Sequence, residues 1–102
     1  MSVVVVRYRT HPDRADENAA LVEQVFAELA VTQPAGLRYA TFRLADGLSF
    51  VHVAEVTTDD GANPLADVVA FGEFQREIPD RLAEGPVVAE ATVVGSYAFG
   101  FA

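Results

Sequence analysis

His52 is the side chain of this 102-residue chain that is best suited to chemistry. It lies in the middle of a strand-like run, where alternation places it on the same side as Phe50 and beside Thr41 and Tyr39 of the preceding run. An imidazole in a pocket can take a proton from a substrate or orient a phenolate. The alternative is a hydrogen-bonded histidine at a contact between two subunits. Both interpretations stay open at the level of sequence.

A second group of side chains could bind a substrate. Asn18 lies on an apolar helical stripe, where its amide needs a partner, either nearby backbone, solvent or a ligand. Tyrosines could donate to a substrate carbonyl, although they are also common as amphipathic interface residues. Phenylalanines at helical spacing are typical of a core, and one of them could line a cavity. The predicted substrate-binding residues are Asn18, Tyr39, Thr41, Phe71, Phe74 and Tyr97.

Strong catalytic signatures are missing from the sequence. It contains no HExxH pair, Gly-rich phosphate loop, nucleophile elbow or metal-spaced cluster. It also lacks cysteine, which excludes a disulfide framework and a thiolate metal site. We therefore expect neither a metal nor another cofactor.

The segment Leu37–Val56 must position most of the candidate side chains. Two runs rich in β-branched and aromatic residues flank Asp46-Gly47, a dipeptide that suits a two-residue hairpin turn. The resulting register places Arg38 opposite Glu55, and opposite charges favour that pairing. One face of the ribbon is then largely apolar, and the other mixes aromatic rings with Thr, His and Arg. The predicted pairs are Arg38–Glu55, Tyr39–Ala54, Ala40–Val53, Thr41–His52, Phe42–Val51 and Arg43–Phe50.

The order of elements predicts a fold. A β-α-β-β-α-β chain is typical of the α+β, ferredoxin-like arrangement, a four-stranded antiparallel sheet with two helices on one face. Right-handed crossovers place the first strand between the third and the fourth. Residues 1–102 are expected to form one domain. Before the hairpin we expect a strand over Val3–Arg9, whose Tyr8 approaches the surface, and a helix from Arg14 to about Val31 with Asp13 as its N-cap. After the hairpin we expect a helix that starts at Asn63 and ends or kinks at Pro79. A break at Glu84–Pro86 and a strand over Val87–Tyr97 follow.

The charge of the chain and the expected uncovered face of the sheet limit the partners that it can bind. A net charge of −8 repels phosphate backbones, so we expect no nucleic acid. The apolar run at the N-terminus is too short for a signal peptide or a membrane span, which makes a cytoplasmic, soluble protein without a membrane partner the default. Two helices cover only one sheet face, and the tail Ala98–Ala102 carries two phenylalanines. We therefore expect a homodimer formed through the sheet face.

Five stretches carry a resemblance to a known family: residues 14–18 (RADEN), 34–53, 63–65 (NPL), 73–75 (EFQ) and 93–97 (VVGSY). They resemble the antibiotic-biosynthesis-monooxygenase-like (ABM-like) proteins of the dimeric α/β-barrel superfamily, in a subgroup of small bacterial proteins. The resemblance implies a homodimer whose two sheets form one barrel, with a cleft between helices and sheet in each subunit. Some relatives oxidise polycyclic aromatic substrates with O2 and neither metal nor flavin, and others degrade haem.

The chain departs from the haem-degrading relatives. They use an Asn on the first strand, a Trp, and a His that ligates iron. This sequence has no Trp, and neither histidine falls on the second helix, so haem degradation is not expected. The aromatic-oxidising relatives also use a Trp in the pocket, which this chain lacks.

Two functions remain. In the first, the protein is a cofactor-independent monooxygenase-like enzyme for a small aromatic or polyketide-like substrate, whose carbanion reduces O2. The pocket would supply shape, a hydrogen bond to the substrate oxygen and a base such as His52. In the second, it is a non-catalytic small-molecule-binding or accessory dimer. A cavity of a few hundred Å³ with converging Asn18, His52 and tyrosines favours the first, and a closed core with His52 at the dimer contact favours the second.

Overall fold

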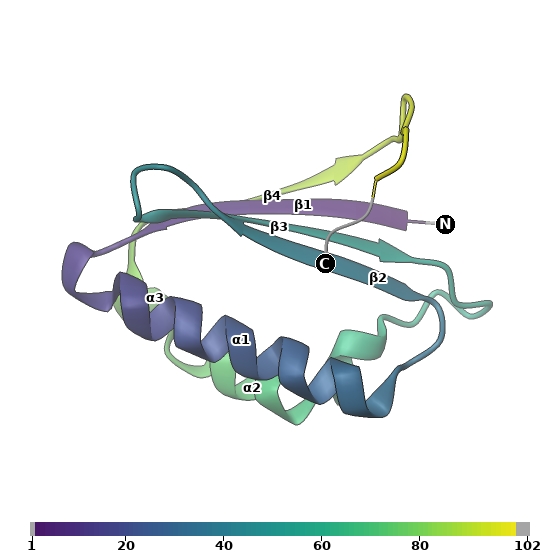
Figure 1. Cartoon of the computed structure of the whole chain (residues 1–102), viewed down its shortest axis with the longest axis horizontal. Helices are drawn as coiled ribbons and strands as arrows, with labels where there is room; N and C mark the ends of the chain where they lie inside the picture. Colours follow the sequence, from purple (N-terminus) through teal and green to yellow (C-terminus); the bar gives the residue numbers. More distant parts are fainter. Residues whose placement is uncertain (1, 100–102) are drawn as a thin grey trace.

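The computed structural model describes residues 2–99, in which helices pack on one side of a sheet (Figure 1). The strands lie in the order β2-β3-β1-β4, and each neighbouring pair is antiparallel. This confirms the predicted α+β, ferredoxin-like arrangement with the first strand between the third and the fourth. The elements are β1 (Ser2–Thr10), the 3-10 turn η1 (Pro12–Arg14), α1 (Ala15–Thr32), β2 (Leu37–Arg43), β3 (Ser49–Val56), the 3-10 turn η2 (Pro64–Asp67), α2 (Val69–Arg76), α3 (Ile78–Arg81) and β4 (Leu82–Ala91).

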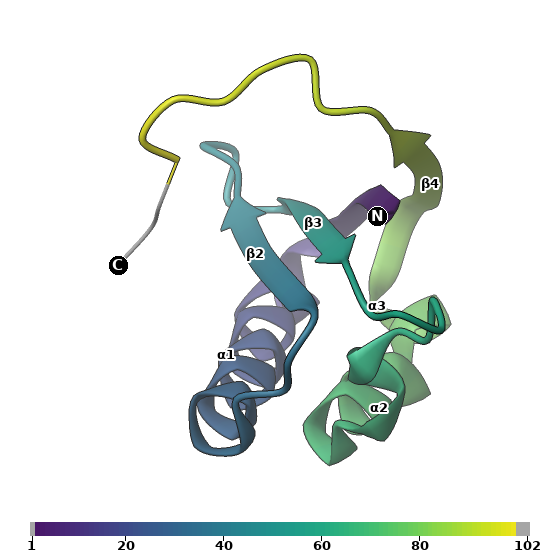
Figure 2. The same ribbon diagram turned by 90° about the vertical axis from the view of Figure 1, so that its right-hand side faces the viewer.

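The two faces of the sheet are covered differently (Figure 2). The helices lie under one face, and the segment 92–99 runs over the other. The mixed face of the hairpin points to the helices, since Phe50 and His52 are buried beside Tyr8. The apolar face therefore points away from the helices, and we call it the outer face. Tyrosine and histidine rings can be buried between the sheet and the helices because their hydroxyl groups and ring nitrogens form hydrogen bonds with one another.

The hairpin register is confirmed, but the expected turn is wrong. All six predicted pairs between β2 and β3 are present. The loop, however, spans residues 45–48 and is closed by the Gly47 amide donating to the Leu44 carbonyl at 3.0 Å. Gly47 has a φ of 74°, whereas Asp46 does not adopt a positive φ, as a type I′ turn would require. Asp46 instead accepts hydrogen bonds from the backbone of Leu48 and Ser49.

Tyr8 does not approach the surface as expected. Its side chain is 4% exposed, and its ring stacks on Phe50 with centroids 5.6 Å apart. The prediction failed because the strand keeps its alternation to Thr10, which is fully buried and donates to the Leu48 carbonyl at 3.1 Å. Arg7 and Arg9 are the exposed members of this stretch.

The helices match the predicted segments, with two corrections. Asp13 is not an N-cap, because residues 12–14 form a 3-10 turn and α1 begins at Ala15 without a side-chain cap. The second helical segment is divided into η2, α2 and α3, with Asn63 capping η2 as predicted through a 3.0 Å bond from the Leu65 amide. The N-terminus of α2 is capped from α1, since the Glu28 carboxylate accepts from the Val69 and Ala70 amides at 2.9 Å each.

The last strand is placed wrongly by the sequence prediction. β4 spans Leu82–Ala91, so it begins before the expected break at Glu84–Pro86 and ends before Tyr97. Gly85 accommodates a register shift against β1 with a φ of 91°, and a Cβ there would meet the Arg7 carbonyl oxygen at 3.0 Å. Of the apolar tail, Ala98 and Phe99 are described, and residues 100–102 lie outside the described residues.

Candidate functional site

His52 is the centre of a hydrogen-bonded cluster between sheet and helices. Its Nε2 lies 2.7 Å from the Tyr8 hydroxyl, and its Nδ1 lies 2.6 Å from the Tyr39 hydroxyl and 3.0 Å from Thr41 Oγ1. The strand register explains this meeting. Thr41 is the direct partner of His52, and Tyr8 pairs with Phe50 one step along the same face. Only 5% of His52 is exposed.

The helices extend the cluster from Tyr8 to a buried arginine. Asn18 of α1 donates from Nδ2 to the Tyr8 hydroxyl at 2.9 Å, and Arg81 of α3 donates from Nε to Asn18 Oδ1 at 3.1 Å. Arg81 also donates from Nη2 to the Phe74 carbonyl. Asn18 is 0% exposed and Arg81 is 1% exposed. Among residues 2–99, every buried side-chain nitrogen and oxygen has a hydrogen-bond partner, so the cluster is a fully satisfied polar network.

Aromatic rings enclose this network. Phe74 lies with its ring centroid 5.5 Å from that of His52, and the Arg81 guanidinium lies 5.2 Å from the Phe74 centroid. Tyr39 stacks on Phe26 at 5.0 Å and meets the edge of Phe71 at 6.5 Å. These apolar neighbours strengthen each hydrogen bond inside the cluster, because they keep water away from it.

Burial sets the protonation states. It lowers the pKa of His52 to about 4, so the imidazole is neutral at pH 7. Burial raises the pKa of Tyr8 to about 12, although the hydrogen bond from Asn18 acts in the opposite direction. Burial also raises the pKa of Tyr39, against the hydrogen bond of Thr41. The site is therefore a set of neutral hydrogen-bonding groups with one buried guanidinium at its far end.

A cleft of about 300 Å³ reaches the cluster at Tyr39. It lies between the end of α1 and the start of β2, and its lining includes Phe26, Leu29, Gln33, Leu37 and Tyr39. Its volume is at the lower end of the range of about 300–1,000 Å³ typical of small-molecule sites. Tyr39 thus lines the cleft and bonds to His52 with its hydroxyl.

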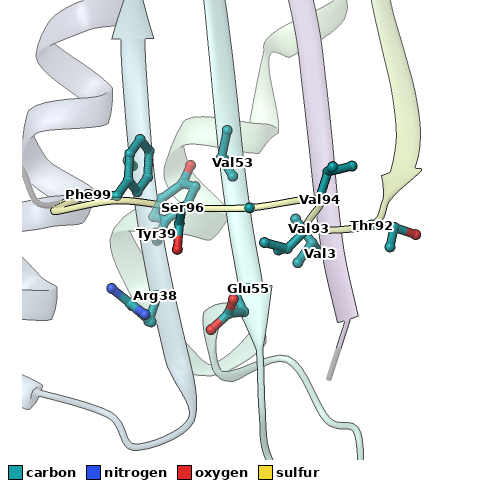
Figure 3. A pocket seen from close by; sticks show the side chains of 12 residues that line it. Val3, Arg38, Tyr39, Val53, Glu55, Thr92, Val93, Val94, Ser96 and Phe99 are labelled. Carbon is teal, nitrogen blue, oxygen red and sulfur yellow. The ribbon is translucent and has the colours of Figure 1, made fainter.

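A second pocket of about 940 Å³ lies on the outer face, between the sheet and the segment 92–99 (Figure 3). The segment crosses in front of β1, β3 and β2, and the pocket is lined by Val3, Val53 and Phe99 as well as the polar Arg38 and Glu55. This pocket lies on the face opposite to the His52 side chain.

Six of the seven predicted site residues meet in one place. His52 bonds to Tyr39 and Thr41, Phe74 packs on its ring, Phe71 packs on Tyr39, and Asn18 joins through Tyr8. Tyr97 does not join them, since it belongs to the segment 92–99 that follows β4 and runs over the outer face (Figure 2), and it is 95% exposed.

Two members of the cluster, Tyr8 and Arg81, were not among the predicted site residues. The alternation of β1 could have identified Tyr8, because a continued strand places it on the same face as Val4 and Val6. No local signal identifies Arg81, which enters the core only because α2 ends and α3 restarts before β4.

Residues 2–99 contain no group of three His, Cys, Asp or Glu side chains placed to hold a metal ion. None of the helices in this range combines the length and the apolar character that crossing a bilayer requires.

Comparison with known proteins gives the fold a family context. No protein-family description and no curated protein matches the sequence. Among solved structures, an antibiotic biosynthesis monooxygenase is similar at 15% identity with a TM-score of 0.72, over 93% of this chain and 100% of that chain. SnoaB from Streptomyces nogalater, a cofactor-independent oxygenase, is similar at 17% identity with a TM-score of 0.68, over 96% and 97%.

A third similar structure comes from a protein of unknown function. NE2512 from Nitrosomonas europaea shares 9% identity and a TM-score of 0.72, over 98% of this chain and 95% of that chain. Identities this low speak for the fold rather than for a shared activity. In fold the chain is therefore ABM-like, with the four-stranded antiparallel sheet and one-sided helices of the antibiotic biosynthesis monooxygenase structures, as its sequence resemblance predicted.

Proposed function

We propose that this protein is a cofactor-independent monooxygenase-like enzyme that acts on a small aromatic or polyketide-like substrate. The observation that carries the proposal is the Tyr39 side chain, which lines the 300 Å³ cleft and is bonded to a buried, neutral His52 at 2.6 Å. The similarity of the fold to a cofactor-independent oxygenase supports it.

The chemistry rests on an activated CH2 group of the substrate beside a carbonyl or phenol oxygen. Loss of a proton to solvent water at the open cleft gives an enolate or phenolate, and the Tyr39 hydroxyl donates to that oxygen. The anion transfers an electron to O2, the two radicals combine, and the resulting peroxide takes a proton back from solvent as it collapses. CH2 thereby becomes C=O, one oxygen atom stays in the product, and the other leaves as water.

His52 serves this reaction better as an orienting group than as a base. Its low pKa makes the imidazole a weak proton acceptor. Its short bond to Tyr39 instead holds the phenol in place.

Turnover of an anthrone-type tricyclic phenol, followed by O2 consumption, tests the proposal. Tyr39→Phe should lower kcat/KM by about tenfold or more, because one hydrogen bond to a charged oxygen contributes about 1.5–3 kcal/mol. His52→Ala should lower kcat/KM by no more than Tyr39→Phe does, because His52 acts through Tyr39, and it should leave the oligomeric state unchanged. Tyr97→Phe, at an exposed position, is the matched control and should keep full activity.

The alternative is a non-catalytic small-molecule-binding or accessory protein. The complete satisfaction of the polar cluster favours it, since no member is left waiting for a ligand. Binding of the same phenol in the cleft, with Tyr39→Phe weakening it but no O2 consumed by the wild type, would establish this function in place of the first.

We further propose that two copies associate through the outer face. That face carries the half-buried Val5, Val51, Val53 and Phe42, and no helix covers it. The segment 92–99 covers it only loosely, leaving the 940 Å³ pocket, while Val94 on that segment is itself fully exposed. A second copy would bury these apolar groups.

Val53→Asp should convert the dimer to a monomer, because it places a charge in the middle of the apolar contact. The molecular mass in solution, measured by light scattering during size exclusion, checks this. Val31→Asp, at a position 84% exposed on α1, is the matched control and should remain dimeric. A wild type that runs as a monomer at all accessible concentrations would contradict the proposed contact.

A further inference from the structure

The polar cluster has a direction that follows from which atoms can donate. Arg81 has donors and no acceptor, so the atom of Asn18 that it contacts at 3.1 Å must be Oδ1. This contact fixes the orientation of the amide. Its Nδ2, which can only donate, therefore faces the Tyr8 hydroxyl at 2.9 Å.

The Tyr8 hydroxyl passes this direction on to His52. Its oxygen already accepts from Asn18, and its second contact is His52 Nε2 at 2.7 Å. If Nε2 carried a proton, the phenolic hydrogen of Tyr8 would be left without a partner in a buried site, at a cost of about 1–3 kcal/mol. Tyr8 therefore donates to Nε2, which acts as an acceptor.

A neutral imidazole carries one proton, and with Nε2 accepting, that proton is on Nδ1. We infer that Arg81, Asn18 and Tyr8 are positioning residues that fix the tautomer of His52 with its proton on Nδ1, where it is donated to the hydroxyls of Tyr39 and Thr41. Every hydrogen bond of the cluster then points the same way, from the guanidinium of Arg81 to Thr41 and to Tyr39, which lines the cleft.

The direction has a consequence for the substrate, and this step rests on the proposed function. A Tyr39 oxygen that accepts from His52 can use its own hydrogen as a donor, either to Thr41 or to a ligand in the cleft. The cleft then favours a ligand that presents an oxygen acceptor, such as a ketone, an enolate or a phenolate. It disfavours a ligand that presents an ammonium group or an N–H donor at the same point.

The tautomer can be measured without any substrate. In protein labelled with 15N, long-range proton–nitrogen correlation spectra distinguish a protonated ring nitrogen from an unprotonated one, and His11→Gln assigns the signals of the two histidines. At pH 7 we expect Nδ1 of His52 to be protonated and Nε2 unprotonated. A wild type with its proton on Nε2 would overturn the inference, whatever any variant does.

Asn18→Asp should reverse the direction of the hydrogen bonds in the cluster, because aspartate has nearly the same shape as asparagine but cannot donate. A carboxylate accepts from Arg81 and cannot donate to Tyr8, so the Tyr8 hydroxyl turns toward it and its oxygen becomes free to accept from Nε2–H. The protonated nitrogen should therefore shift from Nδ1 to Nε2. A folded Asn18→Asp protein that keeps the proton on Nδ1 would show that Asn18 does not set the tautomer.

Tyr39→Phe is the matched control, because it removes a hydroxyl on the other side of His52. Its proton should stay on Nδ1, where Thr41 at 3.0 Å still accepts it. The two proposals fail separately. Protonated Nδ1 without O2 consumption would refute the enzyme and leave the tautomer standing, and O2 consumption with protonated Nε2 would do the reverse.

Discussion

An Arg81→Ala variant should unfold with a free energy lower than that of the wild type by about 3 kcal/mol. Two buried acceptors lose their donor, Oδ1 of Asn18 and the carbonyl of Phe74. Each unsatisfied acceptor costs about 1–3 kcal/mol. The vacated space beside the Phe74 ring adds a packing loss. Removing a buried guanidinium from the core offsets part of this sum, because burial disfavours its charge and lowers the pKa of Arg81.

Arg81→Met separates packing from hydrogen bonding. Methionine retains an apolar stem of similar length and supplies no donor, so the two acceptors remain unsatisfied. Urea unfolding should place Arg81→Met close to Arg81→Ala and well below the wild type. If Arg81→Met were as stable as the wild type, the hydrogen bonds of Arg81 would contribute nothing. In that case the guanidinium would act through packing alone.

A double-mutant cycle with Asn18→Leu tests the pairing directly. Each single substitution leaves one buried group of the Asn18–Arg81 pair without its hydrogen-bond partner. The double substitution removes both groups of the pair together. The double variant should therefore lose less stability than the sum of the two single variants. Gln24→Met, at an exposed position of α1 away from the outer face, is the control, and it should change stability little.

The sequence predicts the hairpin side of the site well, because that part depends on short-range rules. A period of two along each strand and a turn at Asp46-Gly47 fix the register, even though the turn has four loop residues rather than two. That register alone brings Thr41 and Tyr39 to His52. The predicted two-residue loop and the observed four-residue loop give the same register. The error in the turn type therefore did not affect the predicted site.

The helical side of the site depends on contacts that no local pattern contains. Asn18 was recognised as a polar residue on an apolar stripe, but its two partners come from β1 and α3. Arg81 is 63 residues away from Asn18 in the chain. Long-range placement of this kind follows from the docking of α3 against α1, which residue propensities do not determine.

The error at the end of the chain has a related cause. Valines and a tyrosine over residues 87–97 suggest a strand, yet β4 ends at Ala91 and Tyr97 remains exposed. Strand propensity is realised only where a neighbouring strand offers hydrogen bonds. Val3 of β1 pairs with Ala91, so within residues 2–99 only Ser2 of β1 remains as a possible partner beyond that point.

Acid should destabilise the protein through His52, and the loss should fall between pH 6.5 and about pH 4. The pKa of His52 lies at about 4 in the folded state, below its ordinary value of 6.5, because burial disfavours the imidazolium. Between these two values the unfolded chain binds a proton that the folded chain does not. The free energy of unfolding therefore falls as the pH is lowered, by roughly 3 kcal/mol in total at about 1.4 kcal/mol per pH unit.

The contribution of His52 to the pH dependence of stability can be separated from that of Asp46. Hydrogen bonds from Ser49 and Leu48 hold the pKa of Asp46 at about 2, so its contribution is lost mainly below pH 4. Urea unfolding at a fixed protein concentration between pH 7 and 4.5 measures the histidine contribution. His52→Gln should remove the slope in this window, and His11→Gln, at an exposed loop position, should leave it unchanged. A slope that persists in His52→Gln would mean that other groups produce it, and that the folded protein does not lower the pKa of His52 below its ordinary value.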